Sequence, residues 1–362
     1  MATPVRSIHR GSAQLIVFGP QSVEEVGGLV RQLGARRVLV VTTAGRAASE
    51  PGARLVQRLG RAVAGVFEGA APLVPTTAVQ AAAAEARSLG IDGVVSFGGG
   101  SSADLGKAVC WFSEHETGTP LAHLSVPTTY SGASLTAQFA MTDPGSRRTS
   151  VAGEAGLTPG AAVFDPVLTL DVPAGVSAQT GMSALAHGIE CAWSPTRTPE
   201  AEVLALGCVR DVAAALPDVI DDPFDIEARG RMLRASVLGG RALSNAAPGV
   251  GHGLAQLLAG RTGMPHGLAS AVVLAHAVAF TAEEVPDDAA RVGDALGDPD
   301  DVAGAVDRLR ERLGLPSSLA DCGVRLEDLD AVARMSQGHP SVSANPRPVS
   351  EDDARAILAA AY

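Results

Sequence analysis

The chain has 362 residues, 46% of them hydrophobic, and a formal net charge of −11. This length predicts two domains with a large buried core, and the acidic balance excludes nucleic acid and anionic membrane surfaces as main partners. Residues 1–10 contain no apolar segment typical of a signal peptide, and the longest apolar run, 271–280, is too short to span a bilayer. The four cysteines are far apart in the sequence, so we expect reduced, buried thiols in a cytoplasmic protein.

Strands and helices alternate in the first half of the chain. A helix at 22–34 is expected to begin with a capping box of Ser22 and Glu25. Strand-like segments are also expected within 139–164, around a turn at 143–145. This alternation predicts an α/β fold with a doubly wound parallel sheet, Rossmann-like in kind. The other expected elements are strands at 38–42, 63–67, 93–97 and 121–126, a helix at 75–90, and a helix from the glycines at 98–100 to Trp111.

The second half of the chain has helical periodicity throughout. We therefore expect an all-α second domain, with an α/β domain at 1–160 and a helical domain at 161–362. Proline or glycine separates the expected helices, which lie at 177–193, 200–216, 225–243, 244–258, 267–280, 301–313, 326–335 and 350–361.

Three glycines and two serines, 98–102, follow the strand at 93–97 and open the next helix. Glycines let a backbone approach a ligand closely, and a helix start offers unpaired N–H groups to an anion. Ser101 and Asp104 also have the spacing of an N-capping pair. A P-loop is excluded because Ala108 stands where Ser or Thr is required. The pattern indicates a nucleotide-phosphate loop of unspecified kind, and the alternative is a strand-to-helix turn that binds nothing.

Further polar residues are expected at the same edge of the sheet. Ligands of such sheets bind at the carboxyl ends of the strands, where Thr43 and the segment after residue 126 would lie. A turn rich in Ser and Thr, with no ligand, is the alternative interpretation of that segment. Its hydroxyls, which suit hydrogen bonds to ribose or phosphate, belong to Thr128, Thr129, Tyr130 and Ser131.

Three histidines of the second half, His187, His252 and His266, lie in largely apolar helical segments. A lone histidine on an apolar helix is usually a hydrogen-bonded core residue, and the sequence does not show whether the three converge. His266 follows Pro265 and opens a helix, whose dipole is expected to lower its pKa. Three neutral imidazoles suit either a divalent metal ion or the acid and oxyanion contacts of a carbonyl substrate.

Six motifs, taken in order, resemble those of the iron-containing (group III) alcohol dehydrogenases, and together they cover essentially the whole chain. They are Gly-Gly-Gly-Ser at 98–101, Pro-Thr-Thr at 127–129, Phe-Asp-Pro-Val-Leu-Thr at 164–169, Gly-Met-Ser-Ala-Leu-Ala-His at 181–187, Gly-His-Gly-Leu-Ala at 251–255 and Met-Pro-His-Gly at 264–267. Within that family the chain is most similar to the maleylacetate reductase branch. The residues that carry this likeness are Pro-Thr-Thr-Tyr-Ser-Gly at 127–132, Gly-Met at 181–182 and Ala-Asn-Pro-Arg-Pro-Val at 344–349.

The resemblance implies a nucleotide-binding domain at 1–160, a catalytic helical domain at 161–362, and NADH or NADPH in a cleft between them. It also implies a homodimer. At the adenosine ribose, a hydroxyl in place of a carboxylate would leave room for the phosphate of NADP. The implied cofactor-binding residues are Thr43 at that ribose, Gly98, Gly99, Gly100, Ser101 and Ser102 at the pyrophosphate with Asp104 in the same group, and Thr128, Thr129 and Ser131 at the ribose or nicotinamide.

The chain departs from the family pattern at four positions, one of which is near Val74, where the reductase branch usually has a histidine. Metal-dependent members carry an aspartate four residues before the first histidine, where this chain has Ser183. A family histidine four residues after the second one is replaced by Gln256, and a glutamate usual in the reductase branch is replaced by Ser134. Since a serine hydroxyl is a poor metal ligand, we expect an enzyme without a metal.

The resemblance implies reduction of maleylacetate to 3-oxoadipate, a step of aromatic catabolism, by hydride transfer to a conjugated carbon–carbon double bond. His252 and His266 would contact the enolate and supply a proton, with His187 lining the same pocket. Tyr130 and Arg347 would contact maleylacetate, which is an enone acid. The alternative interpretation of Arg347 is a surface residue in a proline-flanked turn. Two other functions stay open: a divergent alcohol or peptide-tailoring dehydrogenase of a biosynthetic pathway, and a non-catalytic nucleotide-binding protein.

Overall fold

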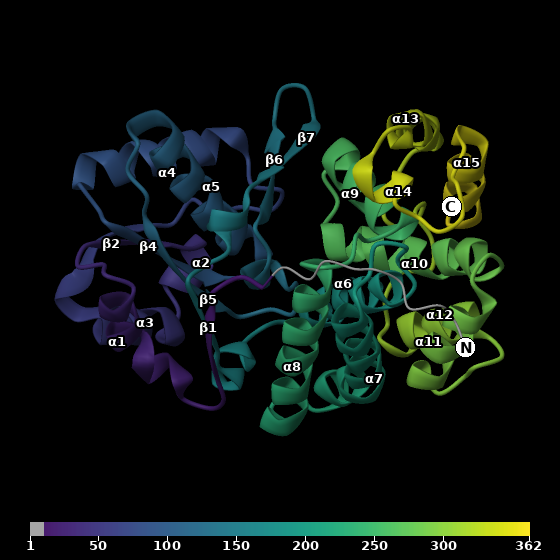
Figure 1. The fold of residues 1–362 in the computed structure, drawn as a ribbon, viewed down its shortest axis with the longest axis horizontal. Helices are drawn as coiled ribbons and strands as arrows, with labels where there is room; N and C mark the ends of the chain where they lie inside the picture. The colour runs from purple at the N-terminus through teal and green to yellow at the C-terminus, as the bar shows by residue number, and fades with distance from the viewer. Residues whose placement is uncertain (1–10) are drawn as a thin grey trace. The chain divides into compact units, whose positions relative to one another are not determined.

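The computed structural model describes residues 11–362, which form two compact units. The sheet unit consists of Ser12–Val176 and Pro223–Leu233, and the helical unit consists of Ser177–Asp222 and Arg234–Tyr362 (Figure 1). This division differs from the expected boundary near residue 160. The physical reason is that the strand at Ala161–Phe164 pairs within the sheet, so that it and the residues after it stay with the sheet unit.

Six parallel strands form the sheet, in the order β1-β8-β5-β4-β2-β3, which confirms the predicted doubly wound α/β fold. The edge strand β1 was not expected from the sequence. A separate antiparallel hairpin, β6 and β7, surrounds the expected turn at 143–145. The strands are β1 (Leu15–Phe18), β2 (Val38–Val41), β3 (Val63–Phe67), β4 (Gly93–Gly98), β5 (Ala122–Pro127), β6 (Gln138–Asp143), β7 (Arg148–Gly153) and β8 (Ala161–Phe164).

Helices cover both faces of the sheet, α1 and α3 on one side and α4 and α5 on the other (Figure 1). The alternation of side chains along a strand produces this arrangement. In β2, Val38 and Val40 pack with the first pair of helices, whereas Leu39 and Val41 pack with the second pair. The helices of this unit are α1 (Val26–Gln32), α2 (Ala44–Ala47), α3 (Glu50–Leu59), α4 (Thr76–Leu89) and α5 (Gly100–Thr117).

The predicted capping box at 22–25 is wrong. These residues form a short 3-10 helix, and the α-helix begins only at Val26. The Ser22 hydroxyl has no hydrogen-bond partner among residues 11–362. Asp165, which is 142 residues from Val23 in the chain, supplies the cap, because its carboxylate accepts the N–H groups of Gln21 and Val23 over 3.1 Å each. A cap from so far along the chain has no local sequence signal.

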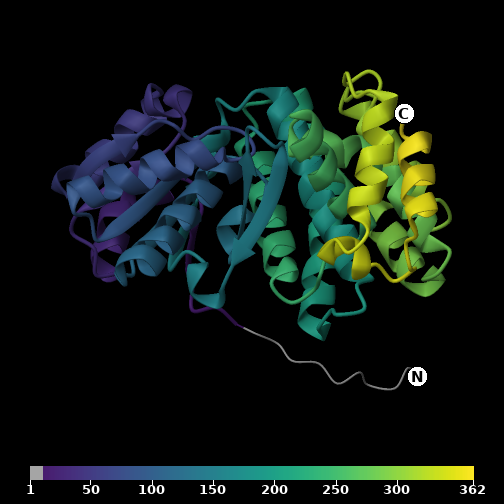
Figure 2. The ribbon, with the colours of Figure 1, turned by 90° about the horizontal axis from the view of Figure 1, so that it is seen from above.

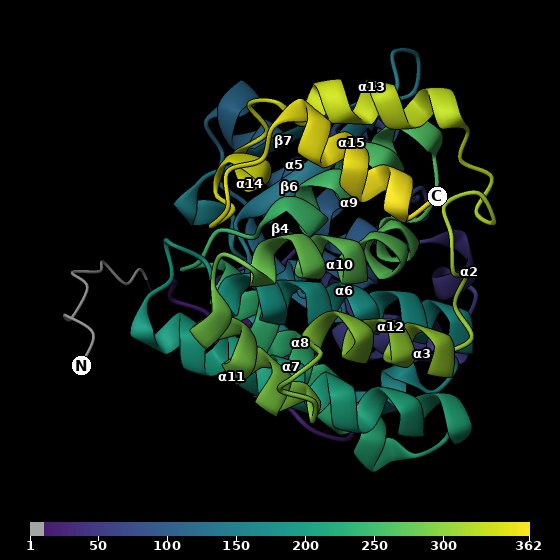
Figure 3. The same ribbon diagram turned by 90° about the vertical axis from the view of Figure 1, so that its right-hand side faces the viewer.

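The second half of the chain is helical, as predicted. Figure 3 shows α10 running through the middle of the helical unit, with α9 and α15 on one side and α12 on the other. Four details differ: α7 extends past the expected residue 216, α9 begins later than the expected residue 244, and neither α11, opened by Pro286, nor the short α14 was expected. The helices are α6 (Ala174–Ala192), α7 (Pro199–Asp221), α8 (Ile226–Leu243), α9 (Val250–Thr262), α10 (His266–Ala282), α11 (Pro286–Leu296), α12 (Val302–Arg312), α13 (Leu326–Ser336), α14 (Pro340–Ser343) and α15 (Glu351–Ala360).

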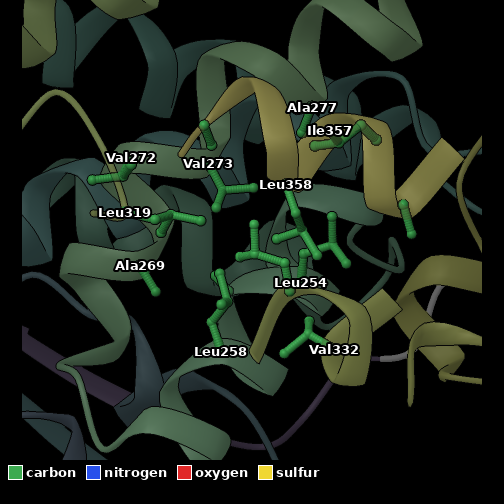
Figure 4. Close-up of a cluster of buried hydrophobic side chains, with 14 of the residues drawn as sticks. Leu254, Leu258, Ala269, Val272, Val273, Ala277, Leu319, Val332, Ile357 and Leu358 are labelled. Carbon is green, nitrogen blue, oxygen red and sulfur yellow. The ribbon is translucent and has the colours of Figure 1, made fainter. Parts of the chain in front are cut away.

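One buried core cluster of the helical unit lies between α9, α10, α13 and α15. Leu254 and Leu258 of α9 meet Val273 of α10 and Leu358 of α15 in one buried cluster (Figure 4). The packing of α13 beside α15 is also visible in Figure 2, where both helices are yellow. Because α10 is apolar around its whole circumference, it is buried on several sides.

The cysteine prediction holds for three of the four thiols. Cys110, Cys191 and Cys208 are free and buried, whereas Cys322 is free but only partly buried. Burial raises the pKa of Cys110 and of Cys208 to about 12, so these two thiols stay protonated at neutral pH. Within residues 11–362, no helix combines the length and the apolar character needed to cross a membrane.

Candidate active site

The sheet unit brings the glycine loop and the hydroxyl segment 128–131 together. Strands β4 and β5 end side by side, with Gly98 in register with Pro127, and Thr128 donates its N–H to Gly98 O over 2.8 Å. Gly98 has a φ of +138°, which favours glycine, and a Cβ there would lie 2.5 Å from Ser102 Oγ. The turn therefore depends on glycine at this position.

The next two glycines leave room in front of α5. A Cβ on Gly99 would lie 3.1 Å from Thr129 Oγ1, and one on Gly100 would lie 3.0 Å from Ser131 Oγ. The hydroxyls of Ser102 and Thr129 are buried and have no hydrogen-bond partner in the described part of the chain. No described side chain caps the N-terminus of α5, so its N–H groups suit an anion. The space beside Gly99 and Gly100, the unpaired hydroxyls of Ser102 and Thr129, and the N-terminus of α5 together fit the phosphate groups of a dinucleotide.

Asp104 does not cap α5, and the predicted pair of Ser101 with Asp104 is wrong. The helix begins at Gly100 with Gly99 as its N-cap, so Ser101 already lies in the first turn. The Asp104 carboxylate instead pairs with the buried Lys107 ammonium over 2.8 Å. Because Asp104 is engaged by Lys107, its predicted contact with the cofactor has no support in this geometry.

The other two hydroxyl residues singled out by the sequence have protein partners. Thr43 follows β2 and caps α2, because its Oγ1 accepts the N–H of Arg46 over 3.2 Å. It is half-buried, and its assignment to the adenosine ribose stays a prediction. Tyr130 is only 1% exposed, and its hydroxyl accepts a hydrogen bond from Arg229 over 3.2 Å. Its predicted contact with the substrate stays a prediction as well.

The three histidines singled out by the sequence converge in the helical unit. The ring centroids of His187 on α6 and His252 on α9 are 5.4 Å apart, and those of His252 and His266 on α10 are 5.3 Å apart. The Nδ1 atom of His252 is buried and has no hydrogen-bond partner among the residues that the structure describes. We call these three residues the histidine cluster.

Two members of the histidine cluster, His187 and His252, are neutral imidazoles at pH 7. Burial lowers the pKa of His187 to about 3, and the neighbouring His266 contributes to this shift. Burial also lowers the pKa of His252 well below its usual range, followed by the effects of His266, His187 and His339. A neutral imidazole keeps one N–H donor and one acceptor nitrogen, so His187 and His252 can donate a hydrogen bond to a developing negative charge without carrying a positive charge themselves.

The stability of the protein is expected to fall between pH 7 and pH 5. Burial lowers the pKa of His123 and of His187 to about 3, but an unfolded histidine binds a proton near its usual pKa of 6.5. The unfolded chain therefore gains more protons than the folded chain as the pH falls below 6.5, and His252 acts in the same direction. Burial raises the pKa of Glu190 to about 7, so the folded chain gains a proton at Glu190 over this pH range. This gain opposes the effect of the histidines, but it comes from one group, whereas three histidines act in the other direction.

We expect the net loss of unfolding free energy to be on the order of 1–3 kcal/mol. Urea unfolding at pH 7 and pH 5 measures it as a lower midpoint at pH 5. A variant with His187→Asn should lose part of this pH dependence. An equal or higher midpoint at pH 5 would contradict the prediction.

One further histidine lies beside the cluster and was not singled out from the sequence. His339 is the N-cap of α14 and is partly buried, which lowers its pKa. Its Nδ1 would lie 3.2 Å from a Cβ on Gly253, the residue that follows His252. The only sequence signal for His339 is its residue type, because it is a loop residue far along the chain from the other histidines.

The interpretation of Arg347 as a grip for a substrate carboxylate is not supported. Its Nη1 donates to Glu283 Oε2 over 2.7 Å and to the carbonyl oxygen of Phe280 over 2.9 Å. The guanidinium carbon also lies 4.0 Å from the centroid of the Phe280 ring. A guanidinium with a carboxylate partner and an aromatic face has contacts within the protein, and its contact with a substrate carboxylate stays a prediction.

Comparison with known proteins places both units in one family. The family model described as iron-containing alcohol dehydrogenase matches residues 13–166, and the one described as Fe-containing alcohol dehydrogenase family, C-terminal, matches residues 177–362. The chain belongs to the iron-containing alcohol dehydrogenase family. It is 35% identical to the maleylacetate reductase of Rhizobium sp. (strain MTP-10005) over 351 residues, which are 96% of this chain and 95% of that protein.

Solved structures show the same relationship. The maleylacetate reductase of Agrobacterium tumefaciens has a TM-score of 0.88 and 32% identity, covering 99% of this chain and 98% of that one. The sulfoacetaldehyde reductase of Bifidobacterium kashiwanohense, solved in complex with NAD+, has a TM-score of 0.87 and 27% identity, covering 97% of each chain. The chain is therefore an NAD(P)-dependent oxidoreductase that resembles maleylacetate reductases, and the interpretation as a non-catalytic protein is set aside.

The residues of the histidine cluster do not fit the iron that the family name implies. No group of three or more His, Cys, Asp or Glu side chains within residues 11–362 is arranged to hold a metal ion. Ser183 lies one helical turn before His187, where metal-dependent members have a carboxylate. The nearby carboxylate of Glu190 is occupied by backbone N–H groups. That the enzyme works without a metal stays a prediction.

We expect the purified enzyme to contain less than stoichiometric metal and to keep its activity in EDTA. Three imidazoles alone lack the negative ligand that often offsets the charge of a divalent ion. Elemental analysis and an assay with chelator test this, and Ser183→Asp is the matched variant, because it restores a carboxylate and should bind zinc more tightly. A stoichiometric ion in the parent enzyme, with activity lost to EDTA and restored by zinc or iron, would contradict the prediction.

Proposed function

We propose that this protein reduces maleylacetate to 3-oxoadipate with NADH or NADPH, a reaction that belongs to aromatic catabolism. The support is the similarity to maleylacetate reductases over nearly the full length of the chain, together with the histidine cluster, in which His187 and His252 are neutral. The glycine loop of the sheet unit fits the pyrophosphate of the cofactor, and a relative of the same fold was solved with NAD+.

The proposed chemistry has two parts. Hydride leaves the reduced nicotinamide for the carbon of the conjugated double bond that is β to the ketone, which oxidises the cofactor and leaves an enolate. A proton then adds to the α-carbon and completes the saturated ketone. An N–H donor close to the enolate oxygen stabilises the negative charge that develops there, and it does so best where water is excluded.

The histidine cluster supplies the donors that this chemistry requires. The single observation that carries the assignment is the approach of His252 to both other rings, at 5.3 and 5.4 Å between centroids. We assign the enolate contact and the proton to His252 and His266, and a place in the lining of the same pocket to His187. The neutral imidazole of His252 suits the enolate contact because it donates a hydrogen bond without requiring protonation at pH 7.

A second candidate function is a divergent dehydrogenase of the same family, which oxidises an alcohol or a peptide end in a biosynthetic pathway. Ser183 and Gln256 favour it, because both depart from the family pattern at positions next to the histidine cluster. Ser134 departs as well, and its buried hydroxyl is 2.8 Å from Ser125 Oγ. The two candidates share the fold and the cofactor and differ in the substrate.

The deciding experiment measures cofactor binding first and turnover second. A thermal shift with NADH and with NADPH shows which cofactor is bound, and the loss of absorbance of the reduced cofactor with maleylacetate measures turnover. Binding with turnover supports the proposed reaction. Binding without turnover favours the divergent dehydrogenase, which a panel of alcohols and aldehydes then tests. Light scattering on the same sample tests the expected homodimer.

A further inference from the structure

At the start of α9, the backbone N–H groups of residues 249–252 all have acceptors in the helical unit. Such groups have no partner within the helix, and they are usually capped by a neighbouring side chain or by water. Here two side chains that are distant in the sequence accept all four. The distances are 2.9 Å from Gly249 N to Glu190 Oε2, 3.1 Å from Val250 N to Asn345 Oδ1, 2.7 Å from Gly251 N to Glu190 Oε1, and 3.1 Å from His252 N to Glu190 Oε2.

Glu190 joins two of the helices that carry the histidine cluster. It lies on α6, three residues after His187, and its carboxylate binds the backbone of α9 as far as His252. The side chain is only 2% exposed, so its burial is costly unless several N–H donors surround it. The carboxylate therefore holds α6 and α9 together at the point where the rings of His187 and His252 meet.

Asn345 joins α9 to α10, the helix that begins with His266. Its Oδ1 accepts the N–H of Val250, and its Nδ2 lies 3.2 Å from Thr281 Oγ1 on α10. The same Nδ2 donates to the carbonyl oxygen of Arg347 over 2.9 Å. Asn345 is 6% exposed, so its amide bonds are made inside the protein. Glu190 and Asn345 together connect the helices of all three clustered histidines.

The side chains of Asn345 and Glu190 approach the start of α9 so closely that Gly249 and Gly251 have no room for a Cβ. A Cβ on Gly249 would lie 2.6 Å from Asn345 Oδ1, and one on Gly251 would lie 2.9 Å from Glu190 Oε1. Both distances are too short for a carbon and an oxygen that are not bonded. The backbone that carries His252 is thus built to receive these two oxygens directly.

We propose that Glu190 and Asn345 are positioning residues for the reaction, which hold the His252 imidazole at the place where it meets the substrate oxygen. This rests on the function proposed above. Both residues act through the backbone at the start of α9, and neither is assigned a contact with substrate or cofactor. Because a displacement of about 1 Å in a catalytic group can cost about 100-fold in rate, the loss of either acceptor is expected to lower turnover.

The variant Glu190→Gln keeps the size of the side chain but turns an NH2 group toward backbone donors. We expect kcat to fall about tenfold or more, while KM for the cofactor stays within about twofold. In a His252→Ala background the same substitution should change kcat by less than about twofold, because the group that Glu190 positions is absent. Ser350→Ala is the matched control, since it removes the cap of α15 in the same unit and should lower thermal stability without changing kcat.

Histidine ring NMR of 15N-labelled protein gives a readout that does not depend on turnover. The His252 signals, identified by their loss in His252→Ala, should shift in Glu190→Gln and in Asn345→Ala, whereas those of the exposed His115 should not. Unchanged His252 signals, or an undiminished effect of Glu190→Gln in the His252→Ala background, would overturn the proposal. Asn345→Ala decides the question if Glu190→Gln does not fold.

The two proposals fail separately in these experiments. If the parent enzyme does not turn over maleylacetate but the His252 signals still shift in both variants, the proposed function is rejected and the positioning of His252 is supported. If the parent enzyme turns over maleylacetate but neither variant changes kcat or the His252 signals, the function stands and the positioning role is rejected.

Discussion

Replacing His252 or His266 by alanine is expected to lower kcat for maleylacetate by about 100-fold or more. Each substitution removes an imidazole from the cluster in which the rings of His252 and His266 are 5.3 Å apart. The loss of one N–H donor at a developing enolate typically costs about 100- to 1,000-fold in rate, because the replacement methyl group offers no hydrogen bond. Steady-state kinetics with saturating cofactor measures the effect.

His276→Ala is the matched control for this prediction. His276 lies on α10, the helix that begins with His266, and it is half-buried, with Asp307 and Arg310 nearby. Its loss should leave kcat within about threefold of the parent value, since it is not part of the histidine cluster. Thermal unfolding of all variants shows whether the fold is retained. An unchanged kcat in both His252→Ala and His266→Ala would mean that these histidines are core residues only.

Gly99→Val is expected to abolish the binding of NADH and NADPH while the protein remains folded. Gly99 has a φ of −81°, which any residue adopts, so the backbone itself does not require glycine. The space does, because a Cβ at this position would already lie 3.1 Å from Thr129 Oγ1 and 3.2 Å from Thr129 Cγ2. The two additional methyl groups of valine would fill the space in front of α5, where we place the pyrophosphate.

Fluorescence titration with each cofactor measures this loss. Gly156→Val is the matched control in the same unit, because a Cβ on Gly156 would have no heavy atom within 4 Å, and it should bind the cofactor as the parent does. Circular dichroism and thermal unfolding check that both variants are folded. A Gly99→Val variant with the parent affinity would show that the glycine loop is not the phosphate cradle.

Several features of the fold could be predicted from the sequence because their causes are local. The apolar β-branched run of β2, the alanine-rich α4 that Gly90 closes, and the three glycines after β4 each form a pattern within a few residues. Hydrophobic periodicity also separates the strand-rich first half from the helical second half. The glycine loop could be located for the same reason, since the turn and the helix start that form it are consecutive in the chain, and its assignment to phosphate stays a prediction.

Other features depend on residues that meet only after folding. The sequence presented three histidines on separate helices but not their convergence, which the packing of α6, α9 and α10 decides. Glu190 lies in an apolar helical run, and nothing local indicates that its carboxylate accepts the N–H groups of a helix start 59 residues later.

What the sequence by itself determined is the class of fold, the glycine turn between β4 and α5, and the family. Only the tertiary structure decided which side chains cap the helices and which side chains pair with the charged groups. Asp165 rather than Ser22 caps the first helical segment, and Glu283 occupies the guanidinium of Arg347. The physical reason is that every buried N–H group and charge must find a partner somewhere in the fold, and a partner distant in sequence leaves no local pattern.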